Sequence, residues 1–375
     1  MTWRQFLKPA AGRRALVSLE PRGTRSTLYS YLSPVIAIVL TLAAGIVIFS
    51  AMGKPPMQAL YVFFVQPLTT AYGATELVVK ATPLVLIAVG LSLGFRSNVW
   101  NIGAEGQFTV GAIFGGGLAI YFHDSESILL LPGTLVAGIV GGMAWAAIPA
   151  WLRTRFNANE ILTSLMLTYV AILALSYLVH GPWRDPDGFN FPESRVFPDA
   201  GIMPVLFEDS RLHLGAVFAL AIVLVGWTLL SRAVIGFQLR VVGAAPAAAR
   251  YGGFREKRLI WFSLLLSGGL AGLAGISEVA GPIGQLLPTI SPGYGFTAII
   301  VAFLGRLHPV GVLFAGLIMA LSYIGGETAQ IELGLPAAVT GLFQGVLLFF
   351  LLGADVLINY RIRFGRARVP QGGAR

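Results

Sequence analysis

The sequence NVWNIGAEGQFTVGA, from Asn98 to Ala112, places a carboxylate and several side-chain amides inside a strongly apolar part of the chain. An apolar run from Glu76 to Phe95 precedes it, and another continues to Phe122. A charge near the middle of a bilayer costs roughly 2.5–3.5 kcal/mol on insertion scales, so such groups usually face a water-filled cavity or a polar partner inside a helical bundle. Glu105 therefore marks either a solute pathway or a structural break between two helices.

The composition around this sequence is that of an integral membrane protein. Of the 375 residues, 56% are hydrophobic and 11% are charged, whereas soluble domains carry about 25% charged residues. Because a spanning helix needs about 20 apolar residues, we expect an all-α, polytopic fold with about ten transmembrane helices. The expected segments are Tyr31–Ser50, Glu76–Phe95, Ala104–Phe122, Ile128–Leu152, Ile161–Val179, Leu214–Leu230, Leu259–Ala280, Tyr294–Leu304, Pro309–Gly325 and Pro336–Leu352.

Two apolar segments do not fit a simple crossing. The eighth segment, Tyr294–Leu304, is too short for a full span, so we expect it to be tilted, broken or partly re-entrant, with protein or water covering its backbone. The aromatic-rich segment Met57–Leu68 is predicted to be an interfacial helix at the level of the lipid headgroups.

The basic residues set the expected orientation. The net charge is +9, and the lysines and arginines are spread over short loops, which membrane topology explains better than a nucleic-acid partner does. With residues 1–30 as a basic cytoplasmic segment before an uncleaved first helix, the cytoplasmic loops are basic and the largest outer loop is acidic. The transmembrane domain then covers residues 31–353. The basic tail, residues 354–375, also lies in the cytoplasm, so both termini are on the same side.

Two loops are longer than a helix connection requires. The outer loop, residues 180–213, contains five prolines and is expected to cap the outer mouth, with direct ligand contact as the alternative. In the cytoplasmic loop, residues 231–258, Pro246 can begin a short helix over Ala247–Tyr251, and Gly252 with Gly253 can end it. Such a helix resembles a docking element; the alternative is a surface helix on anionic lipid.

The polar residues of the opening sequence allow two interpretations. In the structural one, Glu105 bonds to nearby backbone donors or pairs with Arg96 and fixes a helix break. In the functional one, Asn101, Glu105 and Gln107 line a solute pathway. Physical chemistry alone favours neither.

A second polar entry lies at the start of the fifth span. Asn159 is a good helix N-cap, and Glu160 in the first turn suits the helix dipole. Capping explains both residues as well as a pathway role does. Glu278 and Gln285, near an outer helix end, are expected to be interfacial rather than deep.

The sequence carries no recognisable machinery for chemistry. It has no cysteine and four scattered histidines, which excludes thiolate chemistry and gives no metal-ligand spacing. The pair Gly53–Lys54 is followed by Pro55, so a phosphate-binding loop is absent. We therefore expect no catalytic residues, no metal and no cofactor, and any transport must draw its energy from a partner or an ion gradient.

Four ordered segments carry a specific resemblance: Asn101–Ala112, Asn157–Ala171, Val241–Phe254 and Gly293–Leu317. They resemble the signature segments of bacterial ABC-importer permeases of the branched-chain amino acid and simple sugar superfamily, and most closely those of nucleoside uptake systems. The resemblance implies a multi-pass protein of the bacterial cytoplasmic (inner) membrane. It also implies three kinds of partner: a second permease subunit, two cytoplasmic ATPase subunits or a fused tandem ATPase, and an extracytoplasmic substrate-binding protein.

The resemblance also assigns roles to residues. The segment Val241–Phe254 matches the helix that couples the permease to the ATPase. The residues assigned to coupling are Gly243, Pro246, Ala248, Arg250, Tyr251 and Gly253. The family pattern has asparagine before the proline, whereas this chain has Ala245 and so lacks an N-cap there. The residues assigned to the substrate pathway or gate are Asn101, Glu105, Gln107, Asn159, Glu160, Tyr294 and Phe296.

The expected cargo is a nucleoside or a related small polar solute. Amide and carboxylate side chains would bind its hydroxyls and ring nitrogens, and Tyr294 or Phe296 would offer an aromatic face. A ribose-type sugar or a flavin-like vitamin is the alternative within the family. An ion-coupled secondary transporter, in which Glu105 or Glu160 carries protons, is the alternative outside it. Glu105 is expected near the cytoplasmic end of the third span, as an inner-gate residue.

Overall fold

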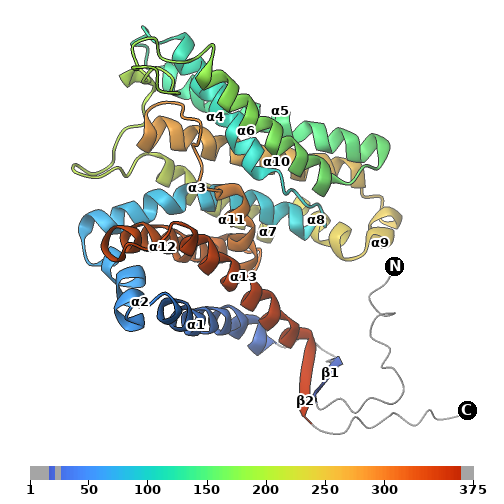
Figure 1. Cartoon of the computed structure of the whole chain (residues 1–375). Helices are drawn as coiled ribbons and strands as arrows, with labels where there is room; N and C mark the ends of the chain where they lie inside the picture. The colour runs from blue at the N-terminus through green and yellow to red at the C-terminus, as the bar shows by residue number, and fades with distance from the viewer. Residues whose placement is uncertain (1–16, 22–26, 365–375) are drawn as a thin grey trace, which may run out of the picture. The chain divides into compact units, whose positions relative to one another are not determined.

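The computed structural model describes residues 17–21 and 27–364, which form helices and one two-stranded ribbon (Figure 1). The helices are α1 (Thr27–Ala51), α2 (Pro56–Phe64), η2 (Gln66–Leu68), α3 (Ala71–Arg96), α4 (Ala104–Tyr121), α5 (Leu130–Phe156), α6 (Glu160–His180), η3 (Asp199–Gly201), α7 (Gly215–Arg232), α8 (Val234–Ala244), α9 (Pro246–Tyr251), α10 (Glu256–Glu278), η4 (Val279–Ile283), α11 (Tyr294–Leu304), α12 (Pro309–Leu333) and α13 (Ala338–Asn359). The expected helical class is confirmed. Most of the predicted basic segment, residues 1–30, and the end of the predicted tail lie outside the described residues.

The chain divides into two compact units. The first comprises residues 1–48 and 345–375, and the second comprises residues 49–344. In the first unit, β1 (Val17–Pro21) pairs antiparallel with β2 (Tyr360–Phe364). Hydropathy did not predict this ribbon, because neither five-residue strand lies in an apolar segment. The second unit contains the helices that carry the candidate site.

Each of the ten expected segments is helical, but the ten crossings are not all established. Seven helices in the described part of the chain are long and apolar enough to cross a membrane. The glycine-rich α4 is not among them, and the apolar part of α13 is shorter. The 11 residues of α11 span about 16 Å at 1.5 Å per residue, against a hydrocarbon core of about 30 Å. The prediction that this segment is too short for a full crossing is therefore confirmed.

Helix α12 is longer than its apolar pattern predicted. The sequence indicated an end at Gly325, whereas the helix continues to Leu333. The charge that interrupts the pattern, Glu327, forms an ion pair with Lys80 of α3 at 3.1 Å. Because this partner compensates the carboxylate, the charge does not end the helix.

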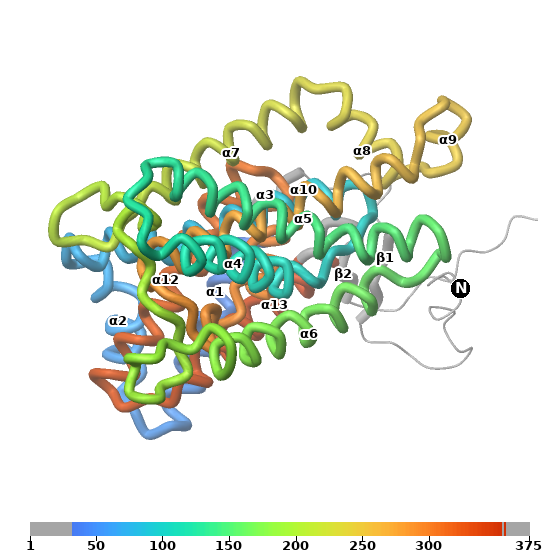
Figure 2. Tube along the Cα trace, turned by 90° about the horizontal axis from the view of Figure 1, so that it is seen from above, coloured from blue at the N-terminus to red at the C-terminus, as the bar shows by residue number. Residues whose placement is uncertain are grey.

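Helices α3 and α10 form the interior of the second unit. Their most apolar windows are 83% and 78% buried, whereas those of α5, α6 and α7 are at most 33% buried. Glycines set the close packing of α10 with α4 and α5, which Figure 2 shows side by side. A Cβ on Gly111 of α4 would lie 2.3 Å from the Cα of Gly272, and one on Gly142 of α5 would lie 2.2 Å from the carbonyl oxygen of Gly268. Small residues let the backbones approach, as is usual inside membranes.

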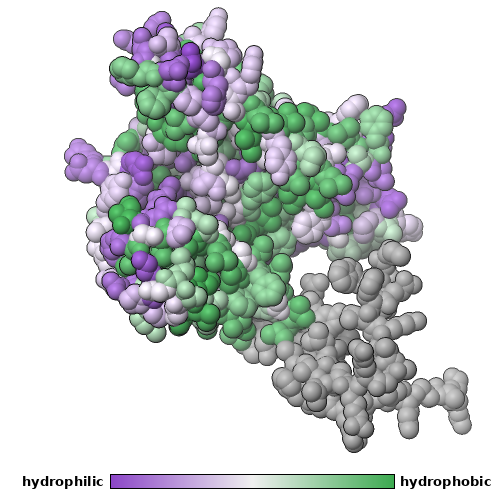
Figure 3. Space-filling model, in the orientation of Figure 1, coloured by the Kyte–Doolittle hydropathy of each residue, from purple (hydrophilic) through white to green (hydrophobic). Residues whose placement is uncertain are grey.

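The outer face of α5 and α6 is apolar. Exposed hydrophobic side chains include Val136 and Val140 on α5 and Leu173 on α6. Figure 3 shows hydrophobic residues over the middle of these helices and hydrophilic residues toward both ends. This band of apolar surface is typical of lipid-facing helices.

Candidate functional site

The first turns of two helices meet at Glu105. Helix α4 begins at Ala104 and α11 begins at Tyr294, and the buried Glu105 carboxylate accepts a hydrogen bond from the backbone N–H of Gly295 at 2.6 Å. A Cβ on Gly295 would lie 2.3 Å from the backbone nitrogen of Glu105, so only glycine permits this approach. Helix N-termini carry partial positive charge. The negative charge of one carboxylate therefore stabilises the positive N-terminal ends of both α4 and α11.

Glu105 lies inside the bundle. Its partner Gly295 precedes the turn that starts at Gly305 by ten residues of α11, which is about 15 Å along the helix. The connection between α3 and α4 is buried as well, because Val99 within it is 1% exposed and the chain folds back into the bundle before α4 begins. Hydropathy cannot distinguish such a buried connection from a surface loop. The expected position of Glu105, near the cytoplasmic end of its span, stays a prediction.

Arg96 is not the partner of Glu105. Its guanidinium Nε donates to the carbonyl oxygen of Leu307 at 2.9 Å, which ties the end of α3 to the turn before α12. Of the two structural partners that the sequence allowed, the backbone donor is the one present.

Asn101 and Gln107 bind each other. The Asn101 amide donates to the Gln107 side-chain oxygen at 2.7 Å and receives a hydrogen bond from the Gln107 amide at 3.0 Å. Asn101 also donates to the hydroxyl of Ser267 on α10 at 2.9 Å. Both amides are almost fully buried. The structure brings these two residues together with Ser267 on α10; their role in a solute pathway stays a prediction.

Asn159 and Glu160 lie at the start of α6. The Asn159 side-chain oxygen accepts from the backbone N–H of Ile161 at 2.9 Å, which is N-cap geometry. Glu160 forms an ion pair with Arg153 of α5 and accepts from the backbone N–H of Trp100 at 3.4 Å. Asn159 therefore caps α6, whereas Glu160 ties the start of α6 to α5 and to the connection before α4.

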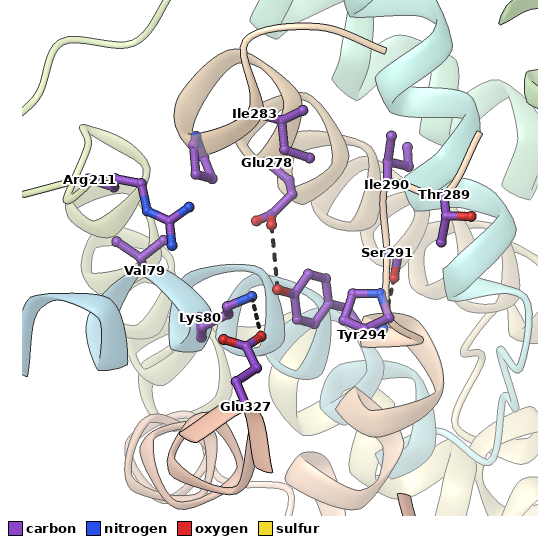
Figure 4. Close-up of a pocket in the computed structure, with 12 residues that line it drawn as sticks. Val79, Lys80, Arg211, Glu278, Ile283, Thr289, Ile290, Ser291, Tyr294 and Glu327 are labelled. Carbon is purple, nitrogen blue, oxygen red and sulfur yellow. Dashed lines mark hydrogen bonds and ion pairs between the residues drawn. The ribbon is translucent and has the colours of Figure 1, made fainter. Parts of the chain in front are cut away.

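A polar cavity of about 290 Å³ lies toward the end of the unit opposite α9 (Figure 4). Its lining comes from α3, the outer loop, α10, η4, the connection between η4 and α11, the first residue of α11, and α12. The residues that line it are Val79, Lys80, Arg211, Glu278, Pro282, Ile283, Thr289, Ile290, Ser291, Pro292, Tyr294 and Glu327. Figure 4 shows the Tyr294 hydroxyl pointing toward Glu278, to which it donates at 3.4 Å.

Sequence analysis identified only one cavity residue, Tyr294, as part of a site. Glu278 is 7% exposed within the protein, and its expected place near the membrane interface stays a prediction. Lys80 and Glu327 were not singled out, although each is a charge inside an otherwise apolar helix, and that signal could have identified them. Arg211 lies in a loop more than a hundred residues from its partner Glu76, so its place could not be read from the chain.

The two predicted aromatic residues occupy different positions. Tyr294 is fully buried, and its ring makes edge contacts with Phe108 and Tyr323 at centroid distances of 6.1 Å and 5.6 Å. Only its hydroxyl end is directed toward Glu278. Phe296 is 40% exposed but is not among the described residues that line the cavity.

The predicted cytoplasmic helix is α9, Pro246–Tyr251, with proline at its first position. Ala245 precedes it without a side-chain cap, as the sequence indicated, and Gly253 follows with φ +78°. Tyr251 is 97% exposed. The Arg250 side chain is mostly exposed, with Glu256 at 3.7 Å.

Helix α9 is anchored although its tip is exposed. Ala249 is buried in a cluster with Leu239 of α8 and Leu93 of α3, while the carbonyl of Ala248 accepts from the N–H of Gly252 at 2.9 Å. A Cβ on Gly243 would lie 2.0 Å from the carbonyl oxygen of Arg96. Gly243 therefore lets α8 pack against the end of α3. The sequence did not predict α8, because its 11 residues are too few for a span.

The outer loop is fastened to the chain between α10 and α11. The N–H of Ser194 donates to the carbonyl of Leu286 at 3.0 Å, and that of Met203 donates to the carbonyl of Ala280 at 2.8 Å. Its far end is held by Arg211, which binds both carboxylate oxygens of Glu76 on α3. These contacts hold the loop to α3 and to the chain between α10 and α11; its role as a cap over the outer mouth stays a prediction.

A helical unit with apolar lipid-facing helices, a polar cavity and an exposed, anchored helix at the opposite end defines a multi-pass membrane permease. The family model described as "branched-chain amino acid transport system / permease component" matches residues 73–352, and the chain belongs to this family. It is an ABC-transporter permease subunit, a transport component and an integral protein of the cytoplasmic membrane. The resemblance seen in the four sequence segments is thereby confirmed.

Three relatives cover most of the chain. A glucose ABC transporter permease protein of Haloferax volcanii is 37% identical over 92% of this chain and 93% of its own length. A guanosine ABC transporter permease protein of Bacillus subtilis is 30% identical, with 92% and 97% covered. A nucleoside ABC transporter permease protein of Lactococcus lactis subsp. cremoris is 27% identical, with 85% and 90% covered.

Proposed function

We propose that this chain is the permease subunit of an ATP-driven importer that moves nucleosides or related small polar solutes by alternating access. The observation that carries this proposal is α9, whose exposed Arg250 and Tyr251 extend from the buried Ala249. A rigid, exposed helix between two membrane helices can transmit motion from a cytoplasmic partner. The guanosine and nucleoside relatives support the cargo class, and the glucose relative supports a sugar as the second candidate.

The proposed topology has ten crossings and two cytoplasmic termini. The end of α3, helix α8 and the turn before α12 gather at one end of the unit, through the contacts of Arg96 with Gly243 and Leu307. Arg240 lies on α8, and Arg306 lies in the turn before α12. The positive-inside rule assigns this end to the cytoplasm. Helix α11 and the connection that precedes it together form one of these ten crossings.

The proposed assembly contains a second permease, two ATPase subunits or a fused tandem ATPase, and an extracytoplasmic substrate-binding protein. The ATPases would hydrolyse ATP in their own sites and dock against α9, where Pro246, Ala248, Arg250 and Tyr251 form the coupling helix and Gly253 follows its end. The outer loop, which lies at the end of the unit opposite α9, would bind the substrate-binding protein. Gly243 would contribute by holding α8 against α3.

The polar residues at α4 and α6 are proposed to control the gate rather than to bind solute. Glu105 joins the first turns of α4 and α11, and the pair of Asn101 and Gln107 joins α4 to α10. Asn159 and Glu160 fix the start of α6. Relative movement of these helices must break such contacts, so the contacts set the energy of the closed state.

Uptake by the complete transporter in proteoliposomes tests this proposal. Uptake of guanosine or glucose that requires ATP on the α9 side, and that persists with an uncoupler, is expected. Uptake that collapses with an uncoupler while ATP is clamped would instead assign the chain to ion-coupled secondary transporters. Adjacent genes for an ATPase, a second permease and a binding protein are expected beside the gene for this chain.

A further inference from the structure

We propose that the protein binds the phosphate group of an anionic phospholipid at the end of the unit that carries α9. The phosphate lies between two arginines, Arg96 at the end of α3 and Arg240 on α8. Helix α8 connects α7 to α9 (Figure 2). The site is separate from the cavity of Figure 4, whose lining contains neither arginine. It is therefore independent of the solute that the protein transports.

The two arginines lie where α8 packs against the end of α3. A Cβ on Gly243 would lie 2.0 Å from the carbonyl oxygen of Arg96. Arg240 precedes Gly243 by three residues and so lies on the same side of α8, where its charge acts on the Arg96 guanidinium. Neither arginine forms an ion pair with a carboxylate in the described part of the chain. Because like charges repel, an anion between the two arginines is stabilising.

Each of the two guanidinium groups is anchored through one nitrogen. The Arg96 Nε donates to the carbonyl oxygen of Leu307 at 2.9 Å, and the Arg240 Nε donates to that of Gly236 at 3.2 Å. The terminal nitrogens of both side chains have no hydrogen-bond partner among the residues that the structure describes. Such a pair of donors on one arginine matches two oxygens of a phosphate. Since the anchors already restrict both side chains, binding costs less entropy.

The turn before α12 forms a third side of the site. His308 directly precedes Pro309, the first residue of α12. Partial burial and the positive charge of Arg96 lower the pKa of the His308 imidazole, so the ring is neutral at pH 7 and can still donate one hydrogen bond. The N-terminus of α12 adds partial positive charge. These groups favour an anion at the position that the two arginines define.

Apolar side chains beside the arginines favour a phospholipid over a free phosphate ion. Four of them, on α8 and on the first two turns of α12, are between 40% and 71% exposed: Val234, Phe237, Val310 and Phe314. Exposed apolar residues next to basic ones are typical of helices that lie at the boundary between headgroups and acyl chains. A lipid would contact the arginines through its phosphate and the apolar side chains through its acyl chains. A free phosphate ion would leave these apolar side chains exposed.

Native mass spectrometry of the complete transporter, purified in detergent and freed of bound lipid, tests the site. The probes are dioleoyl phosphatidylglycerol and, at the same concentration, dioleoyl phosphatidylcholine, whose headgroup has no net charge. We expect the permease to retain one phosphatidylglycerol, and to retain phosphatidylcholine at least about fivefold less, because one basic residue near an anionic lipid contributes about this factor. Ammonium phosphate in place of ammonium acetate should leave phosphatidylglycerol bound.

Three variants make the result specific. Arg240→Gln should lower the retention of phosphatidylglycerol about fivefold, and it should fold normally because Arg240 is exposed and bonds only within its own helix. Arg232→Gln is the matched control, because it removes another exposed arginine at the end of α7, and it should retain the lipid. Arg96→Lys keeps the charge but loses the paired donors, so it should weaken retention to a smaller extent.

Three outcomes would contradict the proposal. Equal retention of the two lipids, or an equal loss in Arg240→Gln and Arg232→Gln, would exclude a specific site at the arginine pair. Displacement of phosphatidylglycerol by ammonium phosphate would assign the pair to a free phosphate ion instead of a lipid. Because lipid retention requires neither a solute nor ATP, its result is independent of the proposed transport function.

Discussion

The carboxylate of Glu105 on α4 accepts the backbone N–H of Gly295 on α11 at 2.6 Å, so one buried charge holds the first turns of two helices together. Both helices direct their positive ends toward it. The backbones are as close as glycine allows, because any Cβ on Gly295 would overlap the backbone of Glu105. This junction lies about 15 Å along α11 from the turn before α12. A change in the positions of the two helices at the junction would therefore alter the interior of the bundle.

Glu105→Gln is expected to weaken this junction without removing its hydrogen bond. The amide oxygen can still accept from Gly295, but the charge that favours two helix N-termini is lost, at a cost of roughly 1–2 kcal/mol. Glu105→Ala additionally leaves the buried N–H unpaired, which costs about 1–3 kcal/mol more. Thermal unfolding of the purified protein in detergent and ATP-driven uptake measure both effects. Wild-type stability and uptake in both variants would show that the carboxylate is dispensable.

Gly111→Ala is expected to disrupt the crossing of α4 and α10. The new methyl group would lie 2.3 Å from the Cα of Gly272, so the helices must separate, and overpacking of this kind costs about 1–3 kcal/mol. Gly341→Ala is the matched control, because its Cβ meets nothing within 4 Å and alanine is the better helix former. Melting temperatures in detergent should fall for the first variant only. Equal melting temperatures would refute the role of close backbone packing.

Local hydropathy predicted the helices well because burial in lipid is a property of each segment by itself. All ten expected segments are helical, and the predicted bounds of Tyr294–Leu304 match α11. The buried connection before α4 was not predictable, since its cover comes from α10 and α6, through contacts such as Asn101 with Ser267. The length of α12 was underestimated because the partner of Glu327 lies on α3.

The site was harder to predict than the fold. Asn101 and Gln107 were recognised as polar residues in an apolar region, but their mutual pairing depends on the fold of the segment between them. The cavity gathers Lys80, Glu278 and Glu327 from three helices, and no spacing along the chain relates them. By contrast, α9 was predicted from proline and glycine alone, because its limits are set by local backbone geometry.

Arg250→Ala combined with Tyr251→Ala is expected to uncouple transport. Both side chains are exposed, so the permease should fold normally, while uptake is lost and substrate-stimulated ATP hydrolysis by the complex falls. Tyr121→Ala is the control, since Tyr121 is also strongly exposed but lies at the other end of the unit. Unchanged uptake in the double variant would remove α9 from the proposed coupling path.

His213 is expected to make the protein less stable in acid. Burial lowers the pKa of its imidazole to about 4, although the nearby Glu76 opposes this shift. Between about pH 6.5 and pH 4 the unfolded chain binds a proton that the folded protein does not, so stability is present above pH 6.5 and falls as the pH drops, by up to about 3 kcal/mol. His213→Asn keeps an acceptor for the N–H of Gly215, which His213 binds at 3.1 Å. Melting temperatures of this variant should depend less on pH across that range, and an identical dependence would exclude His213 as the cause.

Arg211 and Glu76 are expected to be strongly coupled energetically. Glu76 is 5% exposed, and its hydrogen bonds raise the pKa of the Arg211 guanidinium. Arg211→Ala leaves a buried carboxylate unpaired, and because the arginine side chain is half exposed, we expect a loss of roughly 1–3 kcal/mol rather than the full 3–5 kcal/mol of a buried pair. Adding Glu76→Gln removes the unpaired charge and should restore part of the stability. A double-mutant cycle on thermal unfolding in detergent measures this coupling. Purely additive effects would show that the ion pair does not hold the outer loop to α3.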